Sequence, residues 1–115
     1  MSGERASYGD VWMVDFGKPR GHEQAGRRPG LIVSNDFMNH GPSRLVIAVP
    51  ISTKYKGVPT HVPVSPPEGV VQPSFIRCED IRSVSTERLL HRMGEVQAST
   101  MEAVHESIRI LLNIR

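Results

Sequence analysis

The chain has 115 residues, of which 38% are hydrophobic and 23% charged, the composition of an ordinary soluble globular protein. No apolar run approaches the roughly 20 residues of a membrane span, and the first ten residues lack the apolar segment of a signal peptide. These features argue against a membrane protein and predict a cytoplasmic one, folded as a single domain over residues 1–115. A domain this small buries only about 60–70% of its unfolded surface, which favours a homodimer.

The charge of the chain is unevenly distributed. The net charge is +2, with eight basic and five acidic side chains in residues 1–57 and six and seven in residues 58–115. The basic first half suits an anionic partner such as nucleic acid.

The sequence lacks the motifs of metal and cofactor sites. The single cysteine, Cys78, lies among apolar residues, which predicts a buried structural thiol. The five histidines are scattered without metal-ligand spacing, and neither a nucleotide-binding glycine loop nor a nucleophile elbow is present. We therefore expect no metal and no cofactor.

The first elements are two strands joined by a polar loop. Alternating residues predict a strand over 11–16, and a glycine-punctuated cationic loop follows over 17–28. A second short strand is expected over 31–34. Asn35 and Asp36 then have the residue types that cap a brief helix, through residue 39.

The middle of the chain predicts further short strands. The segment 44–51 is nearly continuous in β-branched residues, so we expect it at the centre of the sheet, with Pro50 at a strand end or bulge. Residues 52–57 are expected to form an exposed loop. Further elements are expected as an edge strand at 61–64, a turn at 66–69, strands at 74–77 and 81–84, a helical turn at 86–90 and a strand at 92–96.

The clearest helix is expected near the C-terminus. Ser99 and Glu102 have the spacing of a capping box, and apolar residues at 101, 104, 108, 111 and 112 fall on one helical face. Many short strands with a terminal helix predict a mainly β, α+β fold, a small bent antiparallel sheet or barrel.

Arg28 is the first candidate for chemistry. A guanidinium is a planar, permanently charged fork that matches phosphate oxygens in pairs. Because Arg28 precedes Pro29, it is biased toward extended backbone and so toward a strand entrance. A guanidinium held there can stabilise the charge of a phosphoryl transition state. The alternative is that Arg27 and Arg28 are a solvated surface pair.

Hydroxyl and acid–base groups supply the other candidates. Ser52 and Thr53 follow the longest apolar strand and could bond a phosphate oxygen, although such residues are also common turn formers. Glu23 and His22 in the first loop are residue types that transfer protons, or simply exposed loop residues.

Several segments together resemble the MazF/PemK family of bacterial toxins. The matching pieces are GDVWMVDF at 9–16, G-x-EQ-x-G-x-RP at 21–29, LIVSND at 31–36, VPIST at 49–53, K-G-x-P-T-H-V at 56–62 and R-L-L-x-R-x-G-x-V at 88–96. They cover nearly the whole chain in the family's order.

This resemblance implies a small SH3-like β-barrel of the MazF/PemK/CcdB type with a C-terminal helix. It implies a homodimeric, metal-independent endoribonuclease that cuts single-stranded RNA at a short motif. Cleavage by 2′-hydroxyl attack leaves a 2′,3′-cyclic phosphate or 3′-phosphate and a 5′-hydroxyl. A cognate antitoxin protein binds and inhibits such a toxin.

The resemblance also assigns roles to individual residues. The family's catalytic arginine falls on Arg28 and its catalytic threonine on Ser52, a departure that keeps the hydroxyl without the methyl group. The adjacent Thr53 could share that role. The family's loop acid falls on Glu23, a candidate base, with Gln24 beside it.

The two loops, at 17–27 and 52–58, are expected to flank the RNA. Tyr55 between two lysines suits base stacking beside backbone contacts, or a solvated turn. The same fold includes gyrase poisons that cut nothing, and a catalytically silent RNA-binding module is a third reading. The RNA motif, the antitoxin and the target are left open. The expected RNA contacts are Lys18, Arg20, Gln24, Arg27, Lys54, Tyr55 and Lys56.

Overall fold

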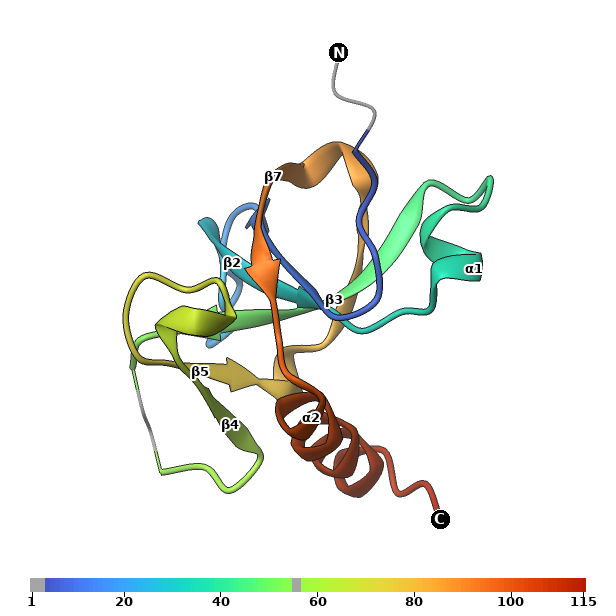
Figure 1. Cartoon of the computed structure of the whole chain (residues 1–115). Coiled ribbons are helices and arrows are strands. Elements are labelled where there is room, and N and C mark those ends of the chain that lie inside the picture. The colour runs from blue at the N-terminus through green and yellow to red at the C-terminus, as the bar shows by residue number, and fades with distance from the viewer. Residues whose placement is uncertain (1–3, 55–56) are drawn as a thin grey trace.

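The fold is one bent antiparallel sheet with a helix packed against it. The computed structural model describes residues 4–54 and 57–115, and within these ranges the chain forms seven strands, two α-helices and three short 3-10 turns (Figure 1). Their bounds are β1 (Asp10–Asp15), β2 (Arg27–Ile32), α1 (Asp36–Asn39), β3 (Leu45–Ser52), β4 (His61–Val64), η1 (Pro66–Glu68), β5 (Ser74–Arg77), η2 (Cys78–Asp80), β6 (Arg82–Ser85), η3 (Thr86–Arg88), β7 (Leu89–Glu95) and α2 (Ala98–Leu111).

The strands follow the order β4-β5-β3-β2-β1-β7, and β6 pairs with the first half of β3. The pairs along this path are antiparallel, so the expected mainly β fold with a C-terminal helix is confirmed. The sheet bends strongly without closing into a complete barrel, because β4 and β7 do not pair with each other in the described part of the chain.

The open ends of the sheet are brought together by two glycines. Gly69, at the end of η1, has a φ of 100°, and it lies against Gly94 of β7. A Cβ on Gly94 would lie 2.7 Å from the Gly69 Cα, closer than real Cβ contacts. Backbone packing therefore completes the barrel-like shape where hydrogen-bonded pairing does not.

The prediction that the 44–51 segment is central is confirmed, because β3 pairs with β2, β5 and β6. Its first half, from Leu45 to Ala48, pairs with β6, and its end, Ile51 and Ser52, pairs with β5. Pro50 ends the pairing of β3 with β2 and, on the other edge, lies between the pairing with β6 and the pairing with β5, so it falls where the ladders end.

The expected boundary of the first loop is wrong by two residues. Arg27 and Arg28 belong to β2, where they pair with Asp15 and Val14 of β1. Pro29 is tolerated there because β2 pairs with β3 only from Gly30 onward, leaving the other edge of β2 open at the proline.

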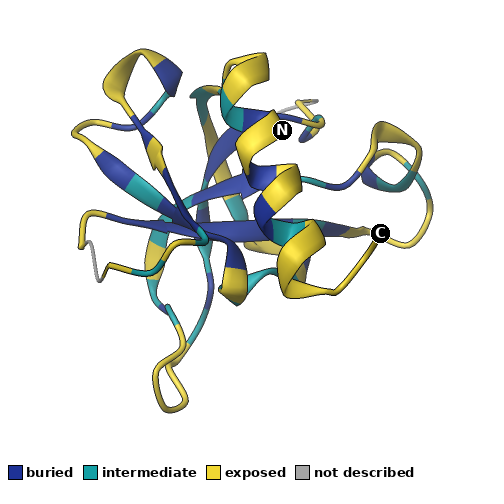
Figure 2. Ribbon diagram, turned by 90° about the horizontal axis from the view of Figure 1, so that it is seen from below, coloured by how far each residue is buried: buried dark blue, intermediate teal, exposed yellow. Residues whose placement is uncertain are grey.

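Two clusters of buried side chains occupy the two faces of the sheet. One contains Val11, Leu31, Val49 and Ile76 and receives Met101 and Val104 from α2. The other contains Trp12, Val14, Phe16, Ile32, Val46, Ala48 and Val84. Figure 2 shows α2 with one buried stripe toward the sheet and an exposed outer face.

The predicted capping box of the terminal helix is wrong. The helix begins at Ala98, its N-cap residue is Gln97, and no side chain of the cap residue bonds the first turn. Instead the Gln97 N–H donates to the Glu68 carboxylate at 2.9 Å, a contact from a distant segment. The apolar face also ends early, because Leu111 and Leu112 are exposed.

Candidate nucleic-acid groove

A groove of about 750 Å³ opens between the β1–β2 loop and the end of β3. It brings together side chains that lie far apart in the sequence, from a loop, a strand entrance and a strand end. The predicted site residues that line it are Lys18, Glu23, Gln24, Arg27, Arg28, Ser52, Thr53 and Lys54.

Two glycines set the neck of the β1–β2 loop. Gly17 and Gly26 have φ values of 82° and 76°, which L side chains adopt with strain. The Gly26 N–H donates to the Gly17 carbonyl at 2.7 Å, and the Phe16 N–H donates to the Gly26 carbonyl at 2.9 Å. The loop is thus anchored at its base, while the residues between the glycines reach over the groove.

Arg28 stands at the entrance of β2, and Ser52 stands at the end of β3; both line the groove. Gly30 pairs with Pro50, and side chains two apart on a strand share a face, so Arg28 and Ser52 lie on the same face of the sheet. The Arg28 Nε–H donates to the Ala25 carbonyl at 2.8 Å, which fixes the stem and leaves the end of the guanidinium toward the groove.

The guanidinium of Arg28 is partly desolvated and has cationic neighbours. Burial lowers its pKa below the ordinary arginine value, and the positive charges of Arg77 and Arg82 lower it further, while Asp80 acts in the opposite direction. The side chain stays charged at neutral pH. A phosphate anion bound beside Arg28 would offset the free-energy cost of partly burying its charge.

The two hydroxyl candidates differ in environment. Ser52 is buried, and its Oγ accepts a hydrogen bond from the Lys54 N–H at 3.2 Å. Thr53 is exposed, one residue past the end of β3. Ser52 shares its face of the sheet with Arg28, whereas Thr53 lies beyond the strand, so the geometry favours Ser52 as the partner of Arg28.

The remaining predicted residues divide into those at the groove and those away from it. Glu23 lines the groove but is exposed, and its Oε1 accepts the Arg20 N–H at 3.1 Å. Arg20 itself is not among the lining residues, and His22 is an exposed residue of the same loop. Tyr55 and Lys56 lie outside the described residues.

A second group of charged residues stands behind Arg28 and was not identified from the sequence. Arg77 ends β5 and Arg82 begins β6, and both lie close enough to affect Arg28. The Arg82 Nη2–H donates to the Gln24 carbonyl at 2.8 Å, and its guanidinium lies 5.1 Å from the Phe16 ring centroid. Arg82 thereby ties the β1–β2 loop to the sheet.

Arg77 is buried and only partly neutralised. Its Nη2 contacts Glu79 at 3.2 Å and its Nε lies 3.6 Å from Asp80. Its Nη1 has no hydrogen-bond partner among the described residues. The local clue to Arg77 and Arg82 was the charged segment RCEDIR at 77–82. By itself such a segment indicates solvent exposure, and only the pairing of the strands shows that Arg77 is buried.

Glu79 joins Arg77 to a buried histidine. Its Oε2 lies 2.6 Å from the Nε2 of His61 on β4. Burial acts to raise the pKa of the Glu79 carboxyl, but hydrogen bonds from His61, its own backbone and Arg77 outweigh burial and hold that pKa below its usual value. The carboxylate therefore stays ionised and fixes Arg77 in place.

Register sets these groups on one face of the sheet. Ser52 pairs with Phe75, Arg77 is two residues further along β5, and Arg77 pairs with His61. An anionic strand in the groove would meet Arg28 and Ser52, with the buried Arg77 behind them. In the described ranges, no group of three or more His, Cys, Asp or Glu side chains has the geometry to hold a metal ion.

The fold and the groove define a class: small bent-sheet proteins with a terminal helix and a cationic groove suited to phosphate. Residues 7–112 match the family described as the PemK-like, MazF-like toxin of type II toxin–antitoxin systems. The chain belongs to this family. In the part of the chain that the structure describes, no helix is long and apolar enough to cross a membrane.

Curated relatives match over most of their length. The chain is 33% identical over 112 residues to the endoribonuclease MazF9 of Mycobacterium tuberculosis, covering 92% of this chain and 95% of that protein. It is 32% identical over 106 residues to the endoribonuclease EndoA of Bacillus subtilis, covering 90% and 91%.

Solved structures share the fold. The crystal structure of MazF from Deinococcus radiodurans has a TM-score of 0.84 at 26% identity, covering 96% of this chain and 99% of that chain. A mycobacterial endoribonuclease in complex with its cognate antitoxin has a TM-score of 0.80 at 25% identity, covering 96% and 97%.

Proposed function

We propose that this protein is the toxin of a type II toxin–antitoxin system, acting as a metal-independent, sequence-specific endoribonuclease on single-stranded RNA. Cleavage of mRNA would stop translation and growth. The observation that carries the proposal is that Arg28 and Ser52 line one groove together with further cations. Family membership and the endoribonuclease relatives support it.

The chemistry uses a nucleophile that the substrate carries. The ribose 2′-hydroxyl attacks the adjacent phosphorus, the 5′-oxygen leaves, and the products end in a 2′,3′-cyclic phosphate and a 5′-hydroxyl. Hydrolysis of the cyclic ester gives a 3′-phosphate. The protein must align the attack and stabilise the added negative charge, which needs no metal-bound water.

Each groove residue takes a role that suits its environment. Arg28 stabilises charge on the phosphoryl oxygens and, staying protonated, on the leaving oxygen. Ser52 donates its hydroxyl to a phosphate oxygen, with Thr53 as the neighbouring alternative. Glu23 is the candidate base, exposed at the rim.

The cations and amides around this pair hold the strand. Arg77 and Arg82 add positive charge behind Arg28 without blocking the groove. Because the 2′-hydroxyl takes part in the reaction, DNA is not a substrate. The proposed RNA contacts remain Lys18, Arg20, Gln24, Arg27, Lys54, Tyr55 and Lys56, of which Tyr55 and Lys56 lie outside the described residues.

The proposed assembly follows the known family members. A single domain over residues 1–115 would form a cytoplasmic homodimer and bind a cognate antitoxin protein that blocks the groove. The support for the antitoxin is the related mycobacterial endoribonuclease, which was solved in complex with its own antitoxin.

Two other functions fit the fold. A gyrase poison would bind protein and leave RNA intact, and a silent RNA-binding module would hold RNA without cutting it. The presence of Arg28 and Ser52 in one cationic groove favours the nuclease, because binding to gyrase requires neither group.

Cleavage of a long RNA in excess EDTA, with gyrase supercoiling measured alongside, separates these functions. We expect cleavage without metal and unchanged supercoiling. Arg28→Ala should lower kcat by about 10²–10³, the usual cost of losing a transition-state charge donor, with little change in Tm. The matched charge loss Arg27→Ala should change kcat less than about threefold, since a strand contact mainly affects KM.

Inhibited supercoiling with intact RNA would support the gyrase poison instead. RNA that is bound but never cut would support the silent module. Full activity in Arg28→Ala would remove Arg28 from the proposed chemistry.

A further inference from the structure

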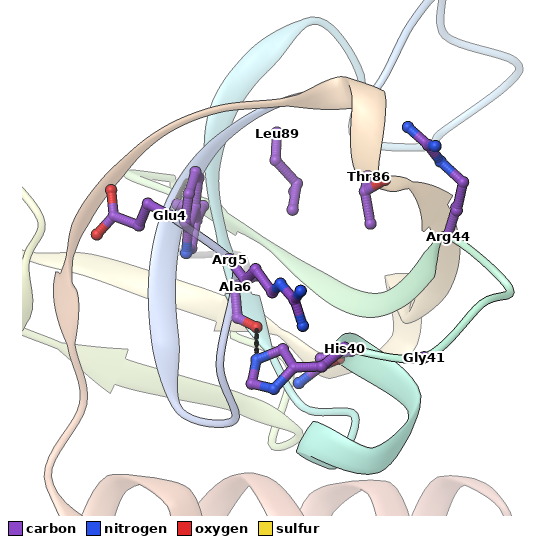
Figure 3. Close-up of a pocket in the computed structure, with 10 residues that line it drawn as sticks. Glu4, Arg5, Ala6, His40, Gly41, Arg44, Thr86 and Leu89 are labelled. Carbon is purple, nitrogen blue, oxygen red and sulfur yellow. Dashed lines mark hydrogen bonds between the residues drawn. The ribbon is translucent and has the colours of Figure 1, made fainter. Parts of the chain in front are cut away.

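A second hollow, of about 440 Å³, is separate from the groove and shares no lining residue with it. The N-terminal segment, the end of α1, the residue before β3 and η3 itself form its walls, and Figure 3 shows Arg5, His40, Arg44 and Thr86 around it. None of these residues belongs to the proposed reaction site. We call this hollow the η3 pocket.

The charges that face the η3 pocket are mostly positive and unused. The guanidinium groups of Arg5 and Arg44 form no hydrogen bond or ion pair with any described residue. Of the described lining residues, Glu4 is the one acid, and it also interacts electrostatically with Arg92. An anion bound in this hollow could form charge-assisted hydrogen bonds with both guanidinium groups, which have no protein partner among the described residues.

The η3 pocket is held in shape by contacts between distant segments. Arg44 has a φ of 58°, unusual for a residue with a side chain, and its carbonyl accepts the Thr86 N–H at 3.0 Å. The His40 Nε2–H donates to the Ala6 carbonyl at 3.0 Å, closing the opposite wall (Figure 3). The left-handed backbone conformation sets the direction in which the Arg44 side chain departs from the backbone.

A single 3-10 turn connects the η3 pocket to the groove. Thr86, its first residue, lines the pocket, and Arg88, its last, reaches the groove loop. The Arg88 Nη1–H donates to the Asp15 carbonyl at 3.1 Å, and the same atom would lie 3.4 Å from a Cβ on Gly17, which lines the groove. Arg88 lines neither hollow, but it lies beside the groove residue Gly17 and forms no salt bridge with described residues.

We propose that the η3 pocket binds a backbone phosphate of the RNA strand some nucleotides away from the phosphodiester that reacts at Arg28. This inference rests on the proposed function. A phosphate between Arg5 and Arg44 would add affinity and fix the register of the strand without taking part in the chemistry, because phosphate contacts position a strand and carry no base information.

Trp12 makes the η3 pocket observable. It lines the pocket and is the single tryptophan of the chain, so one indole N–H resonance reports occupancy. We would titrate labelled protein with 2′-O-methyl strands, which resist 2′-hydroxyl cleavage, of about 4 and about 12 nucleotides, within the range that small single-strand-binding domains cover. Inorganic phosphate and a polyglutamate peptide serve as separate probes.

The variant is Arg5→Gln with Arg44→Asn, because asparagine tolerates a left-handed backbone. The control removes the same charge from the C-terminal end, with Arg109→Gln and Arg115→Gln. We expect the long strand alone to shift the Trp12 indole. We also expect the pocket variant to bind the long strand about tenfold more weakly, with a salt slope smaller by about 0.7 per lost phosphate contact. The control should bind like the wild type.

An unchanged indole resonance with the long strand, or equal affinity of pocket variant and control, would overturn the proposal. A shift with inorganic phosphate but not with the strand would assign the pocket to a free phosphate compound instead. A shift with polyglutamate but not with the strand would assign it to an acidic protein segment. Binding of the long strand through the pocket without cleavage in the wild type would overturn the proposed enzyme and keep this inference.

Discussion

At the scale of single residues, the proposed site depends on a guanidinium and a hydroxyl that come from different strands. Arg28 is fixed by its bond to the Ala25 carbonyl, and Ser52 is buried at the end of β3. Serine here carries the hydroxyl without the methyl group that restricts a threonine rotamer. The buried position supplies part of that restriction through packing.

Ser52 and Thr53 are separable by substitution. We expect Ser52→Ala to lower kcat by about 10²-fold, as for loss of one transition-state donor, and Ser52→Thr to keep activity. Thr53→Ala should stay within about threefold of the wild type, because its side chain is exposed and lies one residue past the end of β3. Single-turnover cleavage of a labelled RNA measures each rate. An inactive Thr53→Ala variant together with an active Ser52→Ala variant would assign the hydroxyl role to Thr53 instead of Ser52.

Cys78 has no part in the chemistry, and its ionisation affects stability instead. Burial raises the pKa of its thiol from 9.0 to about 11. Between these values the unfolded chain loses the thiol proton first, so the free energy of unfolding falls as the pH rises from about 9 to 11. Urea unfolding at several pH values measures this slope. Cys78→Ala should flatten it, and an equal slope in that variant would contradict the assignment.

At the scale of elements, the packing of η1 on β7 substitutes for strand pairing. Gly94→Ala would force a methyl group against the Gly69 backbone, which has no flexible side chain to yield. We expect a loss of about 1–3 kcal/mol, which lowers Tm by roughly 4–12 °C at this chain length. Gly21→Ala, where nothing lies within 4 Å and only the φ of 60° resists, should cost about 1 kcal/mol. A milder effect at Gly94 than at Gly21 would contradict this packing.

The sequence predicted most elements because their signals are local. The apolar run of β3 and the turn residues around η1 needed no tertiary information. The start of α2 was missed because its cap is a carboxylate from Glu68, about 30 residues earlier in the chain. No local pattern encodes such a contact.

The candidate site was predictable only in part, for a similar reason. Arg28 and Ser52 stand out by their neighbours in sequence. Arg77 and Arg82 become relevant because β5 and β6 pair with the same strand, β3, which leads both of them back toward Arg28. Because both residues are far from residue 28 along the chain, the sequence alone does not show that they lie near it in space.

At the scale of the whole molecule, the sheet places α2 and the groove residues on opposite faces. One face packs on α2 and carries the larger apolar cluster, and the other carries the smaller cluster together with Arg28, Ser52 and the charged residues behind them. The groove can thus be cationic without introducing unpaired charge into the core beneath α2. A net charge of only +2 is compatible with a cationic groove, because several of the basic side chains lie together around that groove.

Attack by the 2′-hydroxyl can be tested on one long RNA whose cut position has been mapped from its 5′-hydroxyl ends. The same RNA is then made with a single 2′-deoxy sugar on the 5′ side of that bond and incubated in EDTA. We predict a 2′,3′-cyclic phosphate from the unmodified strand and at least a 10³-fold slower cut at the modified position. Cleavage of the deoxy position at the normal rate would contradict attack by the 2′-hydroxyl and with it this account of the groove.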